Sequence, residues 1–503
     1  MNSMEKSASR PNFLVFMTDH QRGDTLLESS QVKTPNLDKF RKTAVNFTEA
    51  YCTAPHCCPS RASFFTGLFP SQHGVWNNVN VGNRLSAGLY DNVRTFSEDF
   101  AEAGYNMLFS GKWHVSAVES PEARGFKTIA HNLSGYKPIK NQPDLSDWAA
   151  YNGKLDTPDT PRGEGQVVRD GYPGYKLYGE NEHPFGDDKV VDNAIAAMSE
   201  LSPDDEQPFF MYVGVLGPHD PYNVPKRFLD MYDPDEIKLP DSFSDELTDK
   251  PAMYRRIRSL FGQLTEREQR EGIRSYYAFC SYEDYLFGKL VDSLAERGLD
   301  KNTVIVYCSD HGDYVGEHGL WTKGLPCFRE AYNICAMIGG EPIAAKGTSR
   351  DEMVSICDFA PTFLELAGIK PEYKMWGRSL VPFLRGETRS DWRNAMFTQT
   401  NGNEAYGIQR SVTTKKWKYV FNSFDFDELY DLEADPHQLH NLIYAPSLDG
   451  SPYREVVREL CRLLWEFEYE TNDVSVNGYI MTAMCPFGPG IIKDKVGTFK
   501  STL

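Results

Sequence analysis

Short apolar runs that end in a polar side chain recur along the chain. The run 12–18 (NFLVFMT) is followed by Asp19, and the runs 105–110, 209–215 and 303–309 have the same character. A continuous apolar run of this length is typical of a strand that is buried on both faces of a parallel sheet. We therefore predict buried strands at these positions.

Helical patterns alternate with these runs. They cover residues 36–44, 95–103, 187–201, 271–297 and 354–367. Strands that alternate with helices indicate an α/β fold, in which helices flank both faces of a mainly parallel sheet. A chain of 503 residues is also long enough to form two cores, of which we expect one to dominate.

Two parts of the chain depart from this alternation. Residues 131–186 are rich in Gly, Pro, Asp, Asn and Tyr and show little periodicity, which predicts a long loop insertion. Beyond residue 377, short segments predict an antiparallel sheet that is followed by a helix, at 395–399, 407–413, 417–421, 428–431 and 454–468. We therefore divide the chain into a main domain (1–377) and a smaller C-terminal α+β subdomain with an extended tail (378–503).

Polar side chains follow the predicted strands at the point where each one ends. They are Asp19, then Lys112 and His114, then His219, and finally Asp310 and His311. In sheets of this kind, ligands bind at the carboxyl ends of the strands. The pattern therefore predicts one polar site at this edge of the sheet.

Charge and hydropathy limit the partners. A formal net charge of −18 opposes binding to nucleic acid or to another long polyanion. An anionic substrate would need a small positive pocket, which favours a small molecule or a chain end. We expect no membrane span and no signal peptide, because the apolar runs are short and residues 1–10 have no apolar core. The expected location is the cytoplasm for the sequence as written, or the periplasm or exterior if a leader was removed.

The segment Cys57-Cys58-Pro59-Ser60-Arg61 carries the strongest chemical signal. Proline suits the first turn of a helix, so the segment predicts a helix that begins near Cys57. The free N–H groups and the dipole of a helix N-terminus favour an anion at that place. Arg61, about one turn later, can direct its guanidinium to the same spot. The ten cysteines show no zinc-type spacing.

This segment, with the apolar spacer and Thr66-Gly67 that follow it, resembles the signature of the type I sulfatases. Other stretches resemble the same family, namely Gly111-Lys112-Trp113-His114, Pro218-His219-Asp220-Pro221, the stretch 310–323 that ends at Lys323, and LYDLEADP at 429–436. The resemblance implies an alkaline-phosphatase-like fold and a sulfuric ester hydrolase. It also implies that a formylglycine-generating enzyme oxidises Cys57 to formylglycine, whose hydrate attacks sulfur.

The resemblance further implies a ligand set for one divalent metal. The ligands would be Asp19, Asp310, His311 and an oxygen of the modified Cys57. Hard oxygen ligands make Ca²⁺ the first choice. Two features also favour Mn²⁺ or Mg²⁺. One is the histidine ligand, and the other is His20 at the position where many members have a second aspartate. His20 itself is left open between a metal ligand and a structural group.

Catalytic roles follow from the same resemblance. Arg61, Lys112 and Lys323 would hold the sulfate oxygens. Asp310 would take a proton from the attacking hydroxyl, and His219 would donate one to the departing oxygen. His114 would then deprotonate the second hydroxyl and release sulfate from residue 57. His73 and His318 are interpreted as structural.

Alternatives to these assignments remain. Without the family resemblance, Lys112 and His114 would be interpreted as a surface lysine beside a half-buried histidine. Asp19 would be interpreted as a helix cap or a turn residue. The nearest rival function is a phosphonate monoester hydrolase or phosphodiesterase of the same superfamily. A rival of another class is a non-catalytic protein that binds sulfated sugars and leaves Cys57 unmodified.

The substrate is the least constrained feature. Aromatic side chains that can stack on sugar rings favour a small sulfated carbohydrate, or else simply anchor the loop insertion; they are Trp113, Trp148, Tyr151, Tyr172, Tyr175 and Tyr178. The tail from residue 471 is expected to pack over the main domain or over a neighbouring subunit, so a homo-oligomer is possible.

Overall fold

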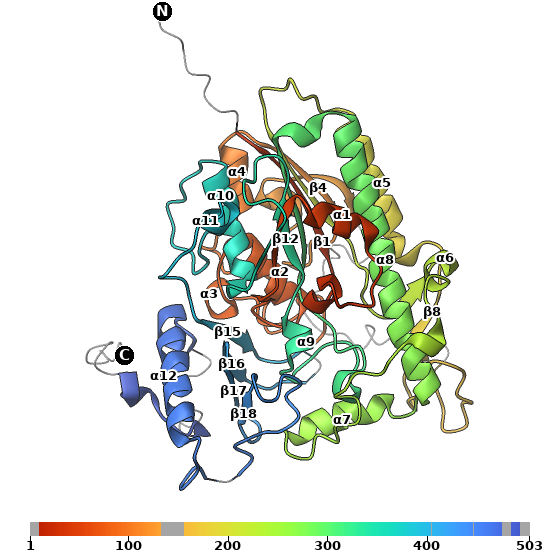
Figure 1. Cartoon of the computed structure of the whole chain (residues 1–503), viewed down its shortest axis with the longest axis vertical. Coiled ribbons are helices and arrows are strands. Elements are labelled where there is room, and N and C mark those ends of the chain that lie inside the picture. The colour runs from red at the N-terminus through yellow and green to blue at the C-terminus, as the bar shows by residue number, and fades with distance from the viewer. Residues whose placement is uncertain (1–9, 132–154, 404, 446, 475–483, 493–503) are drawn as a thin grey trace, which may run out of the picture.

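An eight-stranded sheet forms the centre of the main domain (Figure 1). The computed structural model describes residues 10–131, 155–403, 405–445, 447–474 and 484–492. The strand order is β13 (Thr348–Arg350), β2 (Ala44–Phe47), β12 (Ala336–Gly339), β11 (Thr303–Ser309), β1 (Asn12–Thr18), β9 (Phe209–Gly214), β4 (Asn106–Gly111) and β5 (Lys127–His131). Only β12 runs antiparallel to its neighbours among these strands, so the prediction of a mainly parallel sheet is confirmed.

Strand β1 shows why the sheet is buried on both faces. Phe13, Val15 and Met17 point into one apolar core, whereas Leu14 and Phe16 point into the other. This alternation follows from the two-residue period of a strand. Because both faces are covered, the segment is a continuous apolar run and not an alternating one.

Two groups of helices cover the two faces. The core on the Phe13 face includes side chains of α2 (Cys57–Thr66), α4 (Phe96–Glu102) and α10 (Phe359–Leu366). The core on the opposite face includes side chains of α1 (Pro35–Arg41), α5 (Asp187–Met198) and the long α8 (Glu266–Glu296). The three-layer α/β architecture that the sequence predicts is therefore confirmed.

The C-terminal part forms its own antiparallel sheet of four strands. These are β15 (Ala395–Thr400), β16 (Gln409–Thr414), β17 (Trp417–Asn422) and β18 (Glu428–Asp431), and α12 (Arg454–Thr471) packs on them through a separate core. The predicted α+β subdomain is confirmed, while the boundary at residue 377 stays a prediction.

Further strands and α-helices, most of them short, lie elsewhere in the described chain. They are β3 (Ala50–Tyr51), β6 (Gln166–Val167), β7 (Tyr175–Lys176), β8 (Tyr178–Glu180), β10 (Tyr222–Val224), β14 (Val354–Ser355), α3 (Pro70–His73), α6 (Lys226–Leu229), α7 (Ala252–Phe261), α9 (Arg329–Tyr332) and α11 (Val381–Leu384). Residues 155–186 of the predicted insertion contain only small elements of this kind, and residues 132–154 lie outside the described residues.

Several helix predictions are wrong at one end. The helix predicted over 271–297 already begins at Glu266, and those predicted over 187–201 and 454–468 end at Met198 and Thr471. Two others adjoin a very short strand. The helix predicted over 36–44 stops at Arg41, because Ala44 already belongs to strand β2. The helix predicted over 354–367 begins only at Phe359, since β14 and a short 3₁₀ turn occupy the residues before it. In both places a very short strand adjoins a helix, and no periodicity marks the change.

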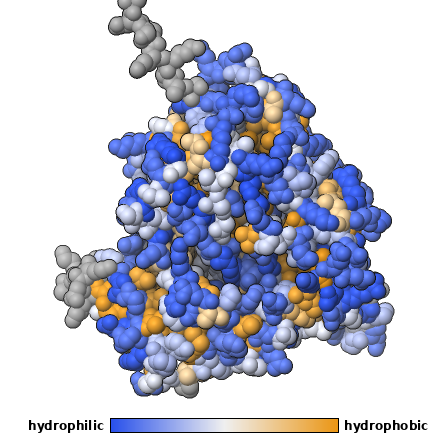
Figure 2. All heavy atoms as spheres, viewed as in Figure 1, coloured by the Kyte–Doolittle hydropathy of each residue, from blue (hydrophilic) through white to orange (hydrophobic). Residues whose placement is uncertain are grey.

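The outer surface is largely hydrophilic in the view of Figure 2, and apolar side chains gather there over the C-terminal subdomain. Within the described ranges, no helix has both the length and the apolar character that crossing a membrane requires.

Candidate active site

Helix α2 places Cys57 at its first residue. His56 before it is extended, Pro59 lies in the first turn, and Gly67 ends the helix with φ +69. Pro59 fits there because the first turn of a helix needs no hydrogen bond from its backbone nitrogen. All residues of α2 are buried, so the thiol faces an enclosed space at the positive end of the helix. The predicted position of Cys57 is confirmed.

The polar residues after the strands meet opposite this helix end. Asp19 follows β1, Lys112 and His114 follow β4, His219 lies beyond β9, and Asp310 and His311 follow β11. The strands β11, β1, β9 and β4 are consecutive neighbours in the sheet, so their carboxyl ends lie side by side. The prediction that these residues share one edge is correct.

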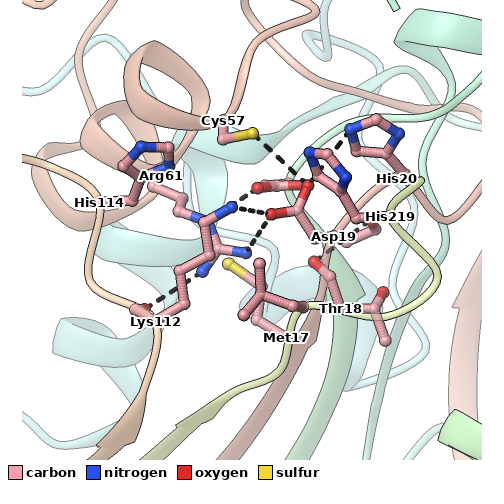
Figure 3. Close-up of polar contacts among 12 residues, drawn as sticks. Met17, Thr18, Asp19, His20, Cys57, Arg61, Lys112, His114 and His219 are labelled. Atoms are coloured by element: carbon pink, nitrogen blue, oxygen red, sulfur yellow. Dashed lines mark hydrogen bonds and ion pairs between the residues drawn. The ribbon is translucent and has the colours of Figure 1, made fainter. Parts of the chain in front are cut away.

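Asp19 lies at the centre of the group (Figure 3). Its Oδ1 atom is 3.5 Å from Cys57 Sγ and 3.5 Å from His311 Nε2. Its Oδ2 atom contacts Lys112 Nζ and is 3.4 Å from an Arg61 nitrogen. One carboxylate therefore faces the thiol with one oxygen and the cationic side chains with the other.

Arg61 is fully buried and contacts the carboxylates of both Asp19 and Asp310. It donates from Nε to Asp310 Oδ2 over 2.7 Å and from a terminal nitrogen to Tyr212 OH over 3.0 Å. A further contact reaches the backbone oxygen of Lys112 at 3.3 Å. Arg61 therefore fixes Asp310 and Asp19 in this structure, and its predicted contact with sulfate stays a prediction.

The donor set fits a divalent cation. Single ligand atoms of Asp19, Cys57, Asp310 and His311 lie within 4.8 Å of one another, and all four residues are buried. Carboxylate oxygens with one imidazole nitrogen suit a hard or borderline cation. These residues would hold the metal that the sequence predicts.

The same charges shift the pKa values of the group. Burial alone raises the pKa of the Cys57 thiol, but Lys112, Lys323 and His311 outweigh it and hold the pKa well below its ordinary value. Burial and the neighbouring Asp19 raise the pKa of Asp310. The site therefore stabilises an anion at position 57, while Asp310 binds a proton more readily than an ordinary aspartate does.

Lys323 and His219 approach the thiol from the other side. Lys323 Nζ is 3.3 Å from Cys57 Sγ and 3.3 Å from His219 Nε2. His219 donates through Nδ1 to the backbone oxygen of Asp220 over 2.5 Å, which leaves Nε2 facing the site. Burial and Lys323 lower the pKa of His219, but Asp220, Cys57 and Asp19 outweigh them and the net shift is upward.

The surroundings of His114 lower its pKa, whereas those of His219 raise the pKa of that ring. Burial and the adjacent Lys112 lower the pKa of His114 to about 4, so the ring is neutral at pH 7. Its Nε2 atom lies 2.8 Å from Asn80 Oδ1, and among the described residues its buried Nδ1 atom has no hydrogen-bond partner. If Nε2 donates to Asn80, Nδ1 carries the lone pair. His114 is thus suited to accept a proton, whereas His219 is suited to donate one.

Comparison with known proteins decides the family. The sulfatase family model matches residues 11–369, and a model for the C-terminal part of N-sulphoglucosamine sulphohydrolase matches residues 316–469. The chain belongs to the sulfatase family. The expected class of enzyme, a sulfuric ester hydrolase, is therefore confirmed.

Individual relatives agree with this assignment. A choline-sulfatase of Rhizobium meliloti is 30% identical over 88% of this chain and 84% of its own length. An N-acetylglucosamine-6-O-sulfatase of Bacteroides thetaiotaomicron is 25% identical, with 94% and 89% covered. The solved structure of a phosphonate monoester hydrolase from Silicibacter pomeroyi has a TM-score of 0.73 at 22% identity, with 93% and 97% covered, which shows a shared fold.

Two histidines of this sulfatase are structural, as predicted. His73 lies 3.0 Å from Ser63 Oγ through Nε2 and accepts from Val75 N through Nδ1. His318 stacks on Phe328 at a centroid distance of 3.6 Å and lies 2.8 Å from Asp245. His73 thereby connects α3 with α2, and His318 connects its turn with Asp245 and Phe328.

The aromatic residues that were candidates for sugar stacking differ in their exposure to solvent. Trp113 is buried against Phe65 and Phe109, so a stacking role is wrong for it. Trp148 and Tyr151 lie outside the described residues. Tyr172 is exposed beside Arg169, whereas Tyr178 is buried. Tyr175, which is half-buried, donates to Asp220 Oδ2 over 2.9 Å and so lies near His219.

Some contributors to the site were missed by the sequence analysis. Tyr212 holds Arg61, Asn80 orients His114, and Asp220 and Asp313 each contact a histidine of the site. Asp313 follows Asp310-His311-Gly312 directly, and Asp220 lies within the stretch Pro218-His219-Asp220-Pro221, so their places in these stretches were the available signals. Tyr212 and Asn80 come from segments that carry no motif.

Proposed function

We propose that this sulfatase hydrolyses the sulfate ester of a small sulfated carbohydrate, with residue 57 in its formylglycine form as the nucleophile and one divalent metal beside it. The observation that carries the proposal is the setting of Cys57. Its sulfur lies 3.3 Å from His311 Nε2, 3.3 Å from Lys323 Nζ and 3.5 Å from Asp19 Oδ1. In the proposal this sulfur marks the place of the formylglycine hydroxyl oxygens.

Asp19, Asp310, His311 and residue 57 would hold the metal. A bound divalent cation supplies Lewis acidity, which favours an ionised nucleophile and draws charge from the sulfate oxygens. Ca²⁺ remains the first expectation, with Mn²⁺ or Mg²⁺ as alternatives. Elemental analysis of the purified protein identifies the ion.

The chain's own side chains carry the remaining steps. Asp310 takes the proton of the attacking hydroxyl of residue 57, and this oxygen attacks sulfur. Lys112 and Lys323, with Arg61 behind the carboxylates, stabilise the charge that develops on the sulfate oxygens. His219 donates the proton that the departing oxygen needs, which its raised pKa supports.

Release of sulfate needs a second proton transfer. The remaining hydroxyl of residue 57 loses its proton to His114, whose lowered pKa keeps it neutral and able to accept. The carbon–oxygen bond to the sulfate then breaks, and the aldehyde forms again. A serine or cysteine at position 57 has no second hydroxyl, which is why the modified residue is needed.

The carbohydrate assignment has independent support. One matched relative is named for N-acetylglucosamine-6-O-sulfate, although another is named for choline sulfate. The buried position of residue 57 favours a small substrate or a chain end over the interior of a polymer. A panel of sulfated monosaccharides and oligosaccharides, with choline sulfate included, tests this; turnover of choline sulfate without turnover of any sugar would remove the carbohydrate assignment.

A phosphonate monoester or phosphate diester hydrolase is the second candidate, because a phosphonate monoester hydrolase shares the fold. Matched aryl sulfate, aryl phosphonate and phosphate diester substrates separate the two functions. A higher kcat/KM for the sulfate ester supports our proposal, and a higher value for either phosphorus ester contradicts it.

The peptide that contains Cys57 gives a test that is independent of the substrate. Conversion to formylglycine replaces the thiol by an aldehyde and makes the peptide lighter, which mass spectrometry detects. Protein made together with a formylglycine-generating enzyme should contain the lighter peptide. An unmodified thiol in protein that binds sulfated sugars would instead support the non-catalytic alternative.

A further inference from the structure

His20 is held in one orientation at the end of β1. It is fully buried, and its φ of +68 lies in the left-handed region, which few non-glycine residues adopt. Tyr276 OH donates to the backbone oxygen of His20 over 2.8 Å, and the next residue, Gln21, donates through its backbone to Ser309 Oγ over 2.9 Å. Contacts from α8 and β11 therefore fix the backbone that carries the ring.

Asp313 determines which ring nitrogen carries the proton. His20 Nδ1 lies 2.7 Å from Asp313 Oδ2, which also accepts from Tyr222 OH over 2.8 Å. The other carboxylate oxygen accepts from the backbone nitrogen of Val315 over 3.0 Å. With this carboxylate as acceptor, the proton resides on Nδ1 and the lone pair on Nε2.

The lone pair of Nε2 is directed at Lys323. His20 Nε2 contacts Lys323 Nζ, and the same ammonium lies 3.3 Å from both Cys57 Sγ and His219 Nε2. A lysine ammonium has three donors, so Lys323 can donate to His20 and to residue 57 at the same time. Asp313, His20 and Lys323 thus form a chain that ends at residue 57.

We propose that His20 is a positioning residue, which accepts a hydrogen bond from Lys323 and fixes that ammonium where the transferred sulfate group binds. The identity of the bound group rests on the proposed function. A lysine side chain has many rotamers, and ordering it upon binding costs free energy. His20 removes part of that cost before the substrate arrives, and Asp313 keeps the imidazole in the tautomer that can accept.

The alternative role for His20 is that of a metal ligand. Its Nε2 atom is 3.7 Å from Asp19 Oδ1, and His20, Asp19, Cys57 and His219 form a group that could hold an ion. One lone pair cannot serve an ammonium and a cation at once. The contact with Lys323 favours the positioning role, and the metal content of a variant distinguishes the two.

The test measures the affinity of the full-length, metal-loaded protein for inorganic sulfate by calorimetry. His20→Ala should weaken sulfate binding about tenfold, as expected for loss of a hydrogen bond to a charged group. The metal content should not change. In a Lys323→Ala background, His20→Ala should have no further effect, and His20→Gln should restore part of the affinity because its amide oxygen can accept.

His183→Ala is the matched control. His183 also pairs with a carboxylate, through Nδ1 to Asp188 Oδ2 over 2.6 Å, but its side chain is 67% exposed and lies outside the site. This variant should bind sulfate like the parent. Loss of metal from His20→Ala would overturn the proposal, as would an equal weakening of sulfate binding with and without Lys323.

A crystal structure of His20→Ala gives a readout that needs neither turnover nor an anion. Lys323 Nζ should leave its place beside residue 57 or lose its order. If it stays there, well ordered, the inference is wrong even when the parent hydrolyses sulfate esters. If the parent protein hydrolyses no sulfate ester, the proposed function is wrong instead. The two failures are therefore distinguishable.

Discussion

Arg61 Nε donates to Asp310 Oδ2 over 2.7 Å, and neither side chain is exposed to solvent. The guanidinium also reaches Asp19 Oδ2 at 3.4 Å. Two buried carboxylates at close range repel each other, and a planar cation with several donors offsets that repulsion. The arginine of the cysteine motif therefore stabilises the carboxylates on which the proposed metal site depends.

Arg61→Lys should consequently destabilise the fold. Lysine keeps the charge but cannot donate in parallel to Asp310 and Asp19, so the buried carboxylates lose partners. Breaking a buried pair costs about 3–5 kcal/mol, and the retained charge places this variant toward the lower end of that range. Urea unfolding of the purified variant measures the change in the free energy of unfolding.

Arg94→Lys is the control for that experiment. Arg94 is 38% exposed and pairs with Asp99 at 3.2 Å and with Glu102 at 2.8 Å. A pair in contact with solvent contributes about 0–1 kcal/mol, so this change should be small. Equal changes in the free energy of unfolding for the two substitutions would show that the contribution of Arg61 to stability does not depend on its burial.

Residue 57 is the most direct test of the proposed chemistry. Cys57→Ala should abolish turnover, because no nucleophile remains. Cys57→Ser should complete at most one round, since a serine sulfate ester has no second hydroxyl from which the aldehyde can form. Rapid-quench measurement of product per enzyme distinguishes one round from many. Sustained turnover by the serine variant would refute the mechanism.

His219 should matter in proportion to the leaving group. A departing alkoxide needs a proton in the transition state, whereas an activated phenolate leaves without one. His219→Asn should therefore lower kcat/KM about 10²–10⁴-fold for alkyl sulfates and much less for activated aryl sulfates. A series of esters with graded leaving-group pKa values measures this difference. Equal losses across the series would remove the acid role.

Much of the fold could be predicted from periodicity alone. The strand over 12–18 and the strand over 303–309 occur at the predicted residues, because burial on both faces makes each one a continuous apolar run. Strands such as β14 (Val354–Ser355) could not be found, since two residues carry no pattern. Such short strands form because they pair with strands that are distant in the sequence. The local sequence pattern does not reveal these pairing partners.

The site divides in the same way. Residues at the ends of the long strands could be placed together, since neighbouring parallel strands end at one edge. The orientation of Arg61 toward Asp310, and not toward open space, could not be predicted, because it depends on Tyr212 and on the Lys112 backbone. Motifs thus predicted which residues meet, whereas packing determines which atoms face one another.

Glu283 links stability to pH. It is buried on α8 with no hydrogen-bond partner for either carboxylate oxygen among the described residues. Burial, with the nearby Asp187 and Asp188, raises its pKa well above 4.5. The folded state therefore keeps a proton that the unfolded state releases, so this contribution is present below about pH 4.5 and is lost as the pH rises toward the folded pKa.

Glu283→Gln should remove this pH dependence. The amide has nearly the same shape and carries no charge, so the midpoint of thermal unfolding should rise relative to the parent as the pH increases from 5 to 9. Scanning fluorimetry across this range measures the difference. The exposed Glu28→Gln is the control and should follow the parent at every pH. Parallel curves for Glu283→Gln and the parent would show that Glu283 does not titrate with folding.

His114 should govern the second half of the reaction and not the first. In the proposed mechanism its ring, kept neutral by a lowered pKa, takes the proton whose loss releases sulfate from residue 57, and it takes no part in the attack on the ester. His114→Ala should therefore still release the alcohol in a rapid first round and then stall with sulfate bound covalently, with kcat lower by about 10²–10⁴-fold. Intact-protein mass spectrometry of the quenched reaction should detect the sulfated enzyme. A slow first round without accumulation of that species would place His114 in the attack step and reverse its assignment.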